Sequence, residues 1–153
     1  MEQSLVILKP DTVQRGLMGD IIGRIERRGL RIAAMKMLHV SRELAEQHYG
    51  EHKGKVFYEP LLAFIGNGPV VALVVEGPEA INLLRGMMGK TNAKEAVPGT
   101  IRGDYGISNR HNLVHGSDSS ESAAREIALF FKPDEIIAYR RASEPWIDPD
   151  AAW

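Results

Sequence analysis

The chain has 153 residues, with 19 Lys and Arg against 20 Asp and Glu, which suits one domain with a buried core and provides no overall basic field for nucleic acid or membrane. It has no cysteine, which excludes disulfides, thiolate catalysis and cysteine-based zinc sites. It shows no secretory signal pattern and no apolar run near the ~20 residues that span a bilayer, so we expect a cytoplasmic protein with no membrane partner.

The first half of the chain alternates apolar runs with amphipathic stretches. The run Ser4–Leu8 predicts a central strand that stops at Pro10, with Lys9 at its carboxyl end. A charged and apolar pattern then predicts a helix that Gly29 ends. The further expected elements are a strand over 30–40, a helix capped by Ser41 and running to about Tyr49, and an amphipathic segment over 56–65.

The second half has the same alternation around one long connection. Val70–Val75 is the most strand-like run, and a helix is expected from about Glu79 to Met88. Residues 89–111 are rich in glycine and lack periodicity, and a connection of that length is usually functional. A short strand into His115, a helix after it and an irregular tail over 148–153 complete the chain.

This order predicts the α+β class. The economical arrangement is a ferredoxin-like βαββαβ fold, in which a four-stranded antiparallel sheet has its helices on one face. We expect a single domain over residues 1–153, since no repeat, linker or low-complexity segment interrupts it.

Three features of the sequence suggest other kinds of site, but each is weak evidence. Gly89-Lys90-Thr91 ends like a P-loop, but Leu84 stands where that pattern requires glycine. His48 to His52 matches the H-x-x-E-H zinc pattern, which needs a continuous helix where Gly50 favours a helix end. The strand 70–75 has no aromatic residue for stacking RNA bases, so no specific nucleic-acid partner is expected.

The stretch Asn112–Ser119 carries the strongest chemical signal. His115 ends a short apolar run just before a helix start, where a neutral imidazole is favoured and phosphate oxygens are attracted. Glu126, in the helix that follows, is placed to accept the second N–H of the ring. The alternative, from this stretch alone, is an ordinary buried histidine held by a carbonyl.

Other polar and aromatic groups occur near expected strand ends and loops. Two guanidiniums, an ammonium, a threonine hydroxyl and one histidine together suit a polyphosphate site without a glycine-rich loop, and phosphoryl transfer onto nitrogen is the chemistry they favour. The group comprises Lys9, Tyr49, Phe57, Arg85, Thr91, Arg102, Asn112, His115, Ser117 and Glu126.

The chain closely resembles nucleoside diphosphate kinases over almost its whole length. The resemblance rests on Ile7–Asp11 with Val13–Gly16, Gln47–Tyr49, Gly68–Ala72, Gly89–Asn92, Pro98–Asp104 and, most specifically, Asn112–Ser119. It departs from the usual family pattern at Lys90, Ala93 and Arg110-His111.

The resemblance implies a ping-pong transfer of the γ-phosphoryl group of a nucleoside triphosphate to a nucleoside diphosphate through a phosphohistidine on His115. It implies that Glu126 holds the distal nitrogen, that Ser117 orients Glu126, and that Lys9 and Tyr49 lie close to the transferring group. Lys9 and Asn112 would bind the sugar, and Phe57 would stack on the base. Arg85, Thr91 and Arg102 would contact the phosphates.

The same resemblance implies Mg²⁺ carried on the nucleotide phosphates, with no direct protein ligand and with Asp118 and Glu51 as candidates for water-mediated contact. It also implies a homo-oligomer, either a tetramer or a hexamer. It further implies broad base and sugar specificity, because stacking on a base does not depend on the hydrogen-bonding groups of that base. The alternatives are a non-catalytic nucleotide-binding regulatory domain of the same fold, which predicts a missing nucleophile or arginine, and the H-x-x-E-H metal hydrolase.

Overall fold

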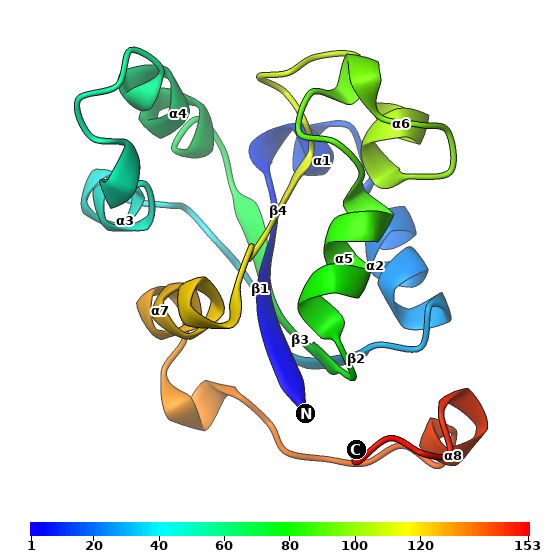
Figure 1. Cartoon of the computed structure of the whole chain (residues 1–153). Helices are drawn as coiled ribbons and strands as arrows, with labels where there is room; N and C mark the ends of the chain where they lie inside the picture. The colour runs from blue at the N-terminus through cyan, green and yellow to red at the C-terminus, as the bar shows by residue number, and fades with distance from the viewer.

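A four-stranded antiparallel sheet forms the centre of the computed structural model, which describes all 153 residues (Figure 1). Its order is β2-β3-β1-β4, so β1 and β3 are central and the other two strands are edges. This confirms the expected ferredoxin-like arrangement. The strands are β1 (Glu2–Leu8), β2 (Arg31–Leu38), β3 (Val70–Gly77) and β4 (Val114–Gly116).

The helices that sequence periodicity predicted are present within a few residues of the expected bounds. They are α2 (Met18–Arg27), α3 (Arg42–His48), α4 (Tyr58–Ile65), α5 (Ala80–Met88) and α7 (Ser120–Phe130). Shorter helical pieces were not expected, and two of these lie in the long connection after α5. They are α1 (Pro10–Gln14), α6 (Ile101–Tyr105), α8 (Glu144–Ile147) and the 3-10 turns η1 (Gly50–His52), η2 (Ala93–Glu95) and η3 (Pro133–Glu135).

Helices cover both faces of the sheet, and the expectation of a single covered face was wrong (Figure 1). Along β1, Leu5 and Ile7 pack in a core with α3, α4 and α7, whereas Val6 and Leu8 pack in a second core with α2 and α5. Val70–Val75 of β3 is at most 5% exposed throughout. An unbroken apolar run of that kind is typical of a strand that is buried on both sides. The run over 70–75 therefore already indicated helices on both faces, and the prediction of one covered face did not take it into account.

The pairing of β4 brings the far end of the chain to β1. The register places His115 opposite Ile7 and Val114 opposite Leu8, so the three-residue strand lies beside the carboxyl end of β1. Lys9 follows directly, and its backbone N–H donates to the carbonyl of Leu113 at 2.9 Å. Residues about a hundred positions apart thus meet where β1 ends.

The last residues cross the sheet edge at its other end. We call residues 137–153 the C-terminal strap. Ile137 donates its N–H to the carbonyl of Ala33 at 2.9 Å, and the Tyr139 hydroxyl donates to the carbonyl of Ile32 at 2.6 Å. The strap therefore runs beside the first half of the edge strand β2 and leaves the second half, with exposed Met35 and Met37, uncovered.

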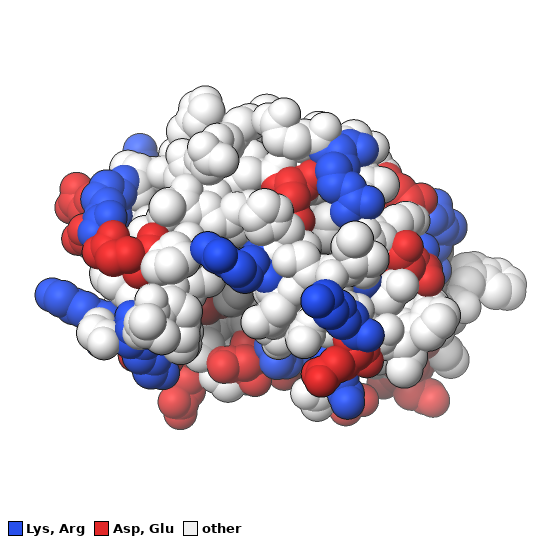
Figure 2. All heavy atoms as spheres, turned by 90° about the horizontal axis from the view of Figure 1, so that it is seen from above, with Lys and Arg blue, Asp and Glu red and all other residues white.

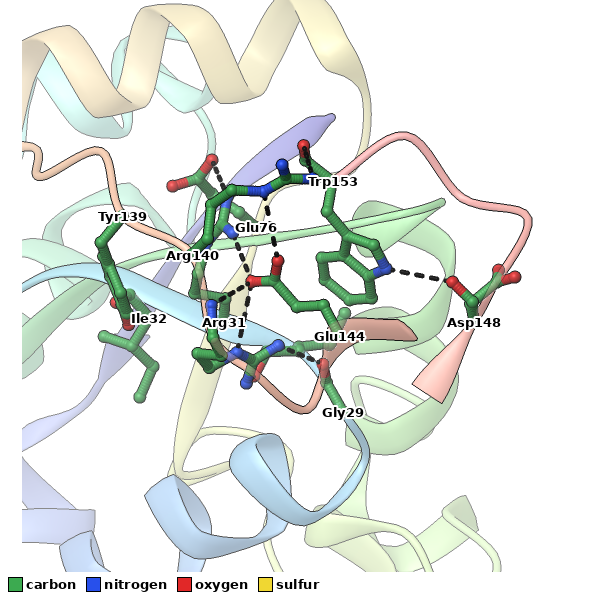
Figure 3. A network of polar contacts seen from close by, with 11 residues as sticks. Gly29, Arg31, Ile32, Glu76, Tyr139, Arg140, Glu144, Asp148 and Trp153 are labelled. Carbon is green, nitrogen blue, oxygen red and sulfur yellow. Dashed lines mark hydrogen bonds and ion pairs between the residues drawn. The ribbon is translucent and has the colours of Figure 1, made fainter. Parts of the chain in front are cut away.

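The strap is held by a buried ion pair (Figure 3). Arg31 Nη1 lies 2.5 Å from Glu144 Oε1, and Glu144 is only 2% exposed. Glu76 lies 3.4 Å from the same guanidinium, and the Trp153 indole packs over Arg141 at 5.5 Å. A buried ion pair of this kind stabilises a fold only while both partners are present.

The face of the molecule seen from above carries no continuous field of one sign (Figure 2). On the face seen from above, basic and acidic side chains are interspersed among uncharged ones (Figure 2). None of the helices has the length and apolar character needed to cross a bilayer.

Candidate active site

A hydrogen-bonded row of three side chains lies between β4 and α7. His115 Nε2 donates to Glu126 Oε1 at 2.9 Å, and the Ser117 hydroxyl donates to the same oxygen at 2.7 Å. The hydroxyl of Ser117 in turn accepts the N–H of Leu5 at 3.0 Å. A carboxylate has no proton to donate, so the imidazole proton is on Nε2 and the lone pair of the neutral ring is on Nδ1.

Helix α7 positions the carboxylate of this row. Ser119 caps the helix by accepting the N–H of Ser122, and Ile127 and Phe130 anchor it in the core under β1. Glu126, beside Ile127, is thereby buried against β4. Burial raises the pKa of its carboxyl, but the hydrogen bonds from His115 and Ser117 outweigh burial and leave the pKa below its ordinary value.

His48 packs directly against the imidazole of His115. The two rings meet edge to face with centroids 4.7 Å apart, and His48 has the same relation to Phe130 at 5.5 Å. His48 is buried, and its Nδ1 has no hydrogen-bond partner. Burial, followed by the proximity of His115, lowers the pKa of His48 to about 3, so this neighbour is uncharged at neutral pH.

Lys9, Asn112 and Thr91 form a second connected group. The Lys9 ammonium donates to Asn112 Oδ1 at 2.8 Å, and the amide of Asn112 donates to the carbonyl of Thr91 at 3.0 Å. Burial, followed by the charge of Arg102, lowers the pKa of Lys9 to about 8, although Asp11 opposes the shift.

Two arginines approach from α5 and α6. Arg102 is buried and donates to three backbone carbonyls, those of Asn112, Gly89 and Val114, at 2.7 to 3.1 Å. Arg85 lies 3.4 Å from the carbonyl of Gly116. Burial, and then the charge of Arg85, lowers the pKa of Arg102 to about 10.

None of Lys9, Arg85 and Arg102 forms an ion pair with a carboxylate. Three cations that lie close together and form no ion pair with a carboxylate attract an anion. The arrangement therefore suits a polyphosphate better than a neutral ligand.

A cavity of about 430 Å³ opens beside Lys9. Its apolar lining includes Phe57, Leu61 and Phe64 from the α4 region, with the Phe64 ring stacked on His111 at 4.6 Å. The remaining lining includes Lys9, Tyr49, Thr91, Asn109, Arg110 and Asn112. The apolar and aromatic side chains of this lining suit a flat aromatic base, and the polar ones suit a sugar and phosphates.

The cavity gathers part of the set expected from the sequence, namely Lys9, Tyr49, Phe57, Thr91 and Asn112. His115, Ser117 and Glu126 do not line it; His115 is linked to it through His48, whose ring contacts both His115 and the lining residue Tyr49. Arg85 and Arg102 do not line it and reach the strand that carries His115 from the α5 and α6 side. Burial raises the pKa of Tyr49 to about 12, so its hydroxyl keeps its proton.

Sequence reasoning overlooked several residues of this region. Phe64, Arg110 and His111 line the cavity, and His48 was considered only in the zinc pattern and within the segment Gln47–Tyr49, without a role in the site. Their spacing gives no signal, because each acquires its neighbours through contacts distant in the chain.

The side chains do not form an oxygen-rich cage for Mg²⁺. The one group of three candidate ligands, His48, His115 and Glu126, supplies two nitrogens, whereas Mg²⁺ prefers oxygen. Asp118 and Glu51 are both exposed carboxylates. These side chains therefore include no group of three oxygen ligands for Mg²⁺.

The zinc pattern is interrupted as expected. Helix α3 ends at His48 and the chain continues in the 3-10 turn η1, so the residues of the pattern do not share one helix face. His48 and His52 do not belong to one three-ligand group.

Comparisons with known proteins agree on one family. A sequence model described as "Nucleoside diphosphate kinase" matches residues 2–136. A nucleoside diphosphate kinase of Carboxydothermus hydrogenoformans is 58% identical over 147 residues, which cover 96% of this chain and 99% of the relative. One of Archaeoglobus fulgidus is 56% identical, with 96% and 97% covered.

Solved structures agree with the sequence comparison. A nucleoside diphosphate kinase of Halobacterium salinarum in complex with CDP superposes with a TM-score of 0.94 at 48% identity, covering 95% of this chain and 97% of that one. One from Borrelia burgdorferi, described as a transition state mimic with bound vanadate and ADP, gives 0.91 at 40% identity, with 95% of each chain covered.

Proposed function

The chain belongs to the nucleoside diphosphate kinase family of phosphotransferase enzymes, and from that premise we propose that it moves a phosphoryl group between nucleotides through His115. The single observation that supports this role most strongly is the bond from Nε2 to Glu126 at 2.9 Å, which leaves the Nδ1 lone pair of the neutral ring available for attack.

In the first half-reaction, Nδ1 attacks the γ-phosphorus of a nucleoside triphosphate in line with the bridging oxygen. The N–P bond forms as the P–O bond breaks, and the electron pair of that bond leaves on the β-phosphate of the departing diphosphate. With phosphorus on Nδ1 and a proton on Nε2 the ring is cationic. The adjacent Glu126 carboxylate stabilises that charge, and Ser117 keeps the carboxylate in place.

In the second half-reaction, a β-phosphate oxygen of another nucleoside diphosphate attacks the phosphohistidine and returns the ring to its neutral form. Negative charge spreads over the transferring group in both steps. Arg85, Arg102 and Lys9 are cations without carboxylate partners in this region and would stabilise that charge, with Thr91 contacting phosphate. Tyr49, protonated beside Lys9 in the cavity, would donate a hydrogen bond close to the same group.

For the nucleoside, we assign the base to Phe57 in the cavity lining and the sugar hydroxyls to Lys9 and Asn112. Phe57 is 44% exposed, so its ring is available for stacking. Stacking tolerates every base, so we propose broad specificity for purines and pyrimidines, ribo and deoxy.

Mg²⁺ belongs to the same proposal as a cofactor that would arrive on the nucleotide phosphates and neutralise their charge, with Asp118 and Glu51 as the candidates to contact it through water. We propose a homo-oligomer, a tetramer or a hexamer. The uncovered half of β2 and the exposed Val97 and Ile107 in the long connection offer apolar surface for subunit contacts.

We place the enzyme in the cytoplasm, where its nucleotide substrates are made and used.

The test is direct. Incubation with ATP and Mg²⁺ should add one phosphoryl group to the protein, labile in acid and stable in base, detected by intact mass spectrometry. His115→Ala should take up none while its circular dichroism stays unchanged, because the ring is only half-buried. Retained turnover in that variant would refute the assignment, and an unlabelled native protein would favour the non-catalytic regulatory domain.

A further inference from the structure

Leu113, two residues before the proposed nucleophile, has a strained backbone. Its φ is +75°, a region that side chains other than glycine rarely adopt, and its side chain is fully buried. The start of α1 holds both of its peptide groups. Asp11 Oδ2 accepts the N–H of Leu113 at 3.0 Å, and the Thr12 hydroxyl donates to its carbonyl at 2.7 Å.

The strained residue lies between two carbonyls that hold Arg102. Nε of Arg102 donates to Asn112 at 3.1 Å and Nη2 donates to Val114 at 2.7 Å. Rotation about φ of Leu113 turns the peptide plane that contains the Asn112 carbonyl. Relaxation of the strain would therefore move an anchor of Arg102 together with the side chain that holds the Lys9 ammonium.

Asp11 has a second feature that packing alone does not explain. Its Oδ1 is buried and accepts no hydrogen bond, which is costly for a carboxylate. The charged and titratable groups around the Lys9 ammonium are Asp11, Arg102, His48 and, across the cavity, Tyr49. Asp11 is the one carboxylate among them whose charge acts on Lys9.

We propose that Asp11 is a positioning residue for phosphoryl transfer: it holds Leu113 in the conformation that places Asn112 and Arg102, and its negative charge offsets the cations around Lys9. The inference rests on the proposed function for its effect on rate, but the titration of Lys9 is independent of turnover.

Three variants separate the two roles. Asp11→Asn keeps an oxygen for the Leu113 N–H but removes the charge. Asp11→Ala removes both, and Leu113→Gly removes the backbone strain that Asp11 holds. Asp134→Asn is the matched control, since Asp134 is exposed and takes part in no ion pair.

We expect Asp11→Asn to shift the Lys9 ammonium titration, followed by ¹⁵N NMR, to lower pH. With the pKa of Lys9 about 8 in the parent chain, a fall of about one unit would lower the protonated fraction, and with it the rate of His115 phosphorylation, about 5-fold at pH 8. At pH 6 the variant should match the parent, and Asp134→Asn should match it at every pH.

We expect Asp11→Ala to slow phosphorylation at all pH values, and to slow it less in the Leu113→Gly background than in the parent. Superimposable Lys9 titrations for Asp11→Asn and the parent would overturn the electrostatic role. An equal loss from Asp11→Ala in both backgrounds would overturn the backbone role. If the parent itself formed no phosphohistidine, the proposed function would fail, while the titration would still decide the role of Asp11.

Discussion

Glu126 Oε1 lies 2.9 Å from His115 Nε2, and the same oxygen also accepts the Ser117 hydroxyl. The contact fixes both the tautomer and the orientation of the His115 ring. The buried carboxylate of Glu126 thereby determines that Nδ1, on the opposite side of the ring, carries the free lone pair.

Glu126→Gln should slow phosphorylation of His115. The amide has no net charge to stabilise the cationic phosphohistidine, and its NH₂ group can force the ring into the wrong tautomer. We expect a loss of at least about 10-fold in the single-turnover rate with ATP, measured by rapid quench, with little change in nucleotide affinity. Glu121→Gln, at the exposed start of the same helix, is the control. An equal rate for both variants would contradict the role of Glu126.

Phe57→Ala should weaken every nucleotide by a similar amount. Loss of one stacking surface is expected to cost about 1–3 kcal/mol, measured as Kd for ADP, GDP, CDP and UDP by calorimetry. Trp146→Ala removes a more exposed aromatic outside the cavity and should leave these constants unchanged. Selective loss of one base would show that Phe57 contacts the nucleotide differently.

His48 should make the fold sensitive to acid. Burial, and then His115, lowers the pKa of His48 from 6.5 to about 3. Between these values the unfolded chain binds more protons than the folded chain, so stability falls as pH falls, by up to about 1.4 kcal/mol per pH unit from this group. Urea unfolding at pH 7 and pH 5 should show a smaller difference for His48→Phe than for the parent or for His39→Gln, which changes an exposed histidine. Parallel shifts in all three proteins would contradict this.

Glu144→Ala should destabilise the chain far more than a surface ion-pair variant. It leaves the buried Arg31 guanidinium without its nearest carboxylate, for which we expect a loss of about 3–5 kcal/mol in the free energy of unfolding. The exposed pair Arg42–Glu46 is the comparison, and Glu46→Ala should cost no more than about 1 kcal/mol by the same urea titration. Equal losses would mean that Glu76 alone compensates Arg31.

The elements that the sequence predicted well are those specified by neighbours in the chain. The cap at Ser41, the helix 120–130 after His115 and the proximity of His115 to Glu126 all follow from local spacing. By contrast, Arg102 was recognised as a cation, but its anchoring on Gly89, Asn112 and Val114 depends on how the long connection folds. The contacts of Asp11 with Leu113 and of His48 with His115 span 102 and 67 residues and leave no pattern that spacing could reveal.

The C-terminal strap affects how much of the chain is needed for a stable fold. The family model ends at residue 136, although relatives match over 147 residues, and the carboxylate that pairs with Arg31 and the hydroxyl that donates to the carbonyl of Ile32 both lie beyond it. A fragment cut after residue 136 would keep every group proposed for chemistry, but it would leave the Arg31 guanidinium with Glu76 as its one carboxylate partner and would uncover the edge of β2. The part of the chain that the proposed chemistry needs is therefore shorter than the part that the fold needs.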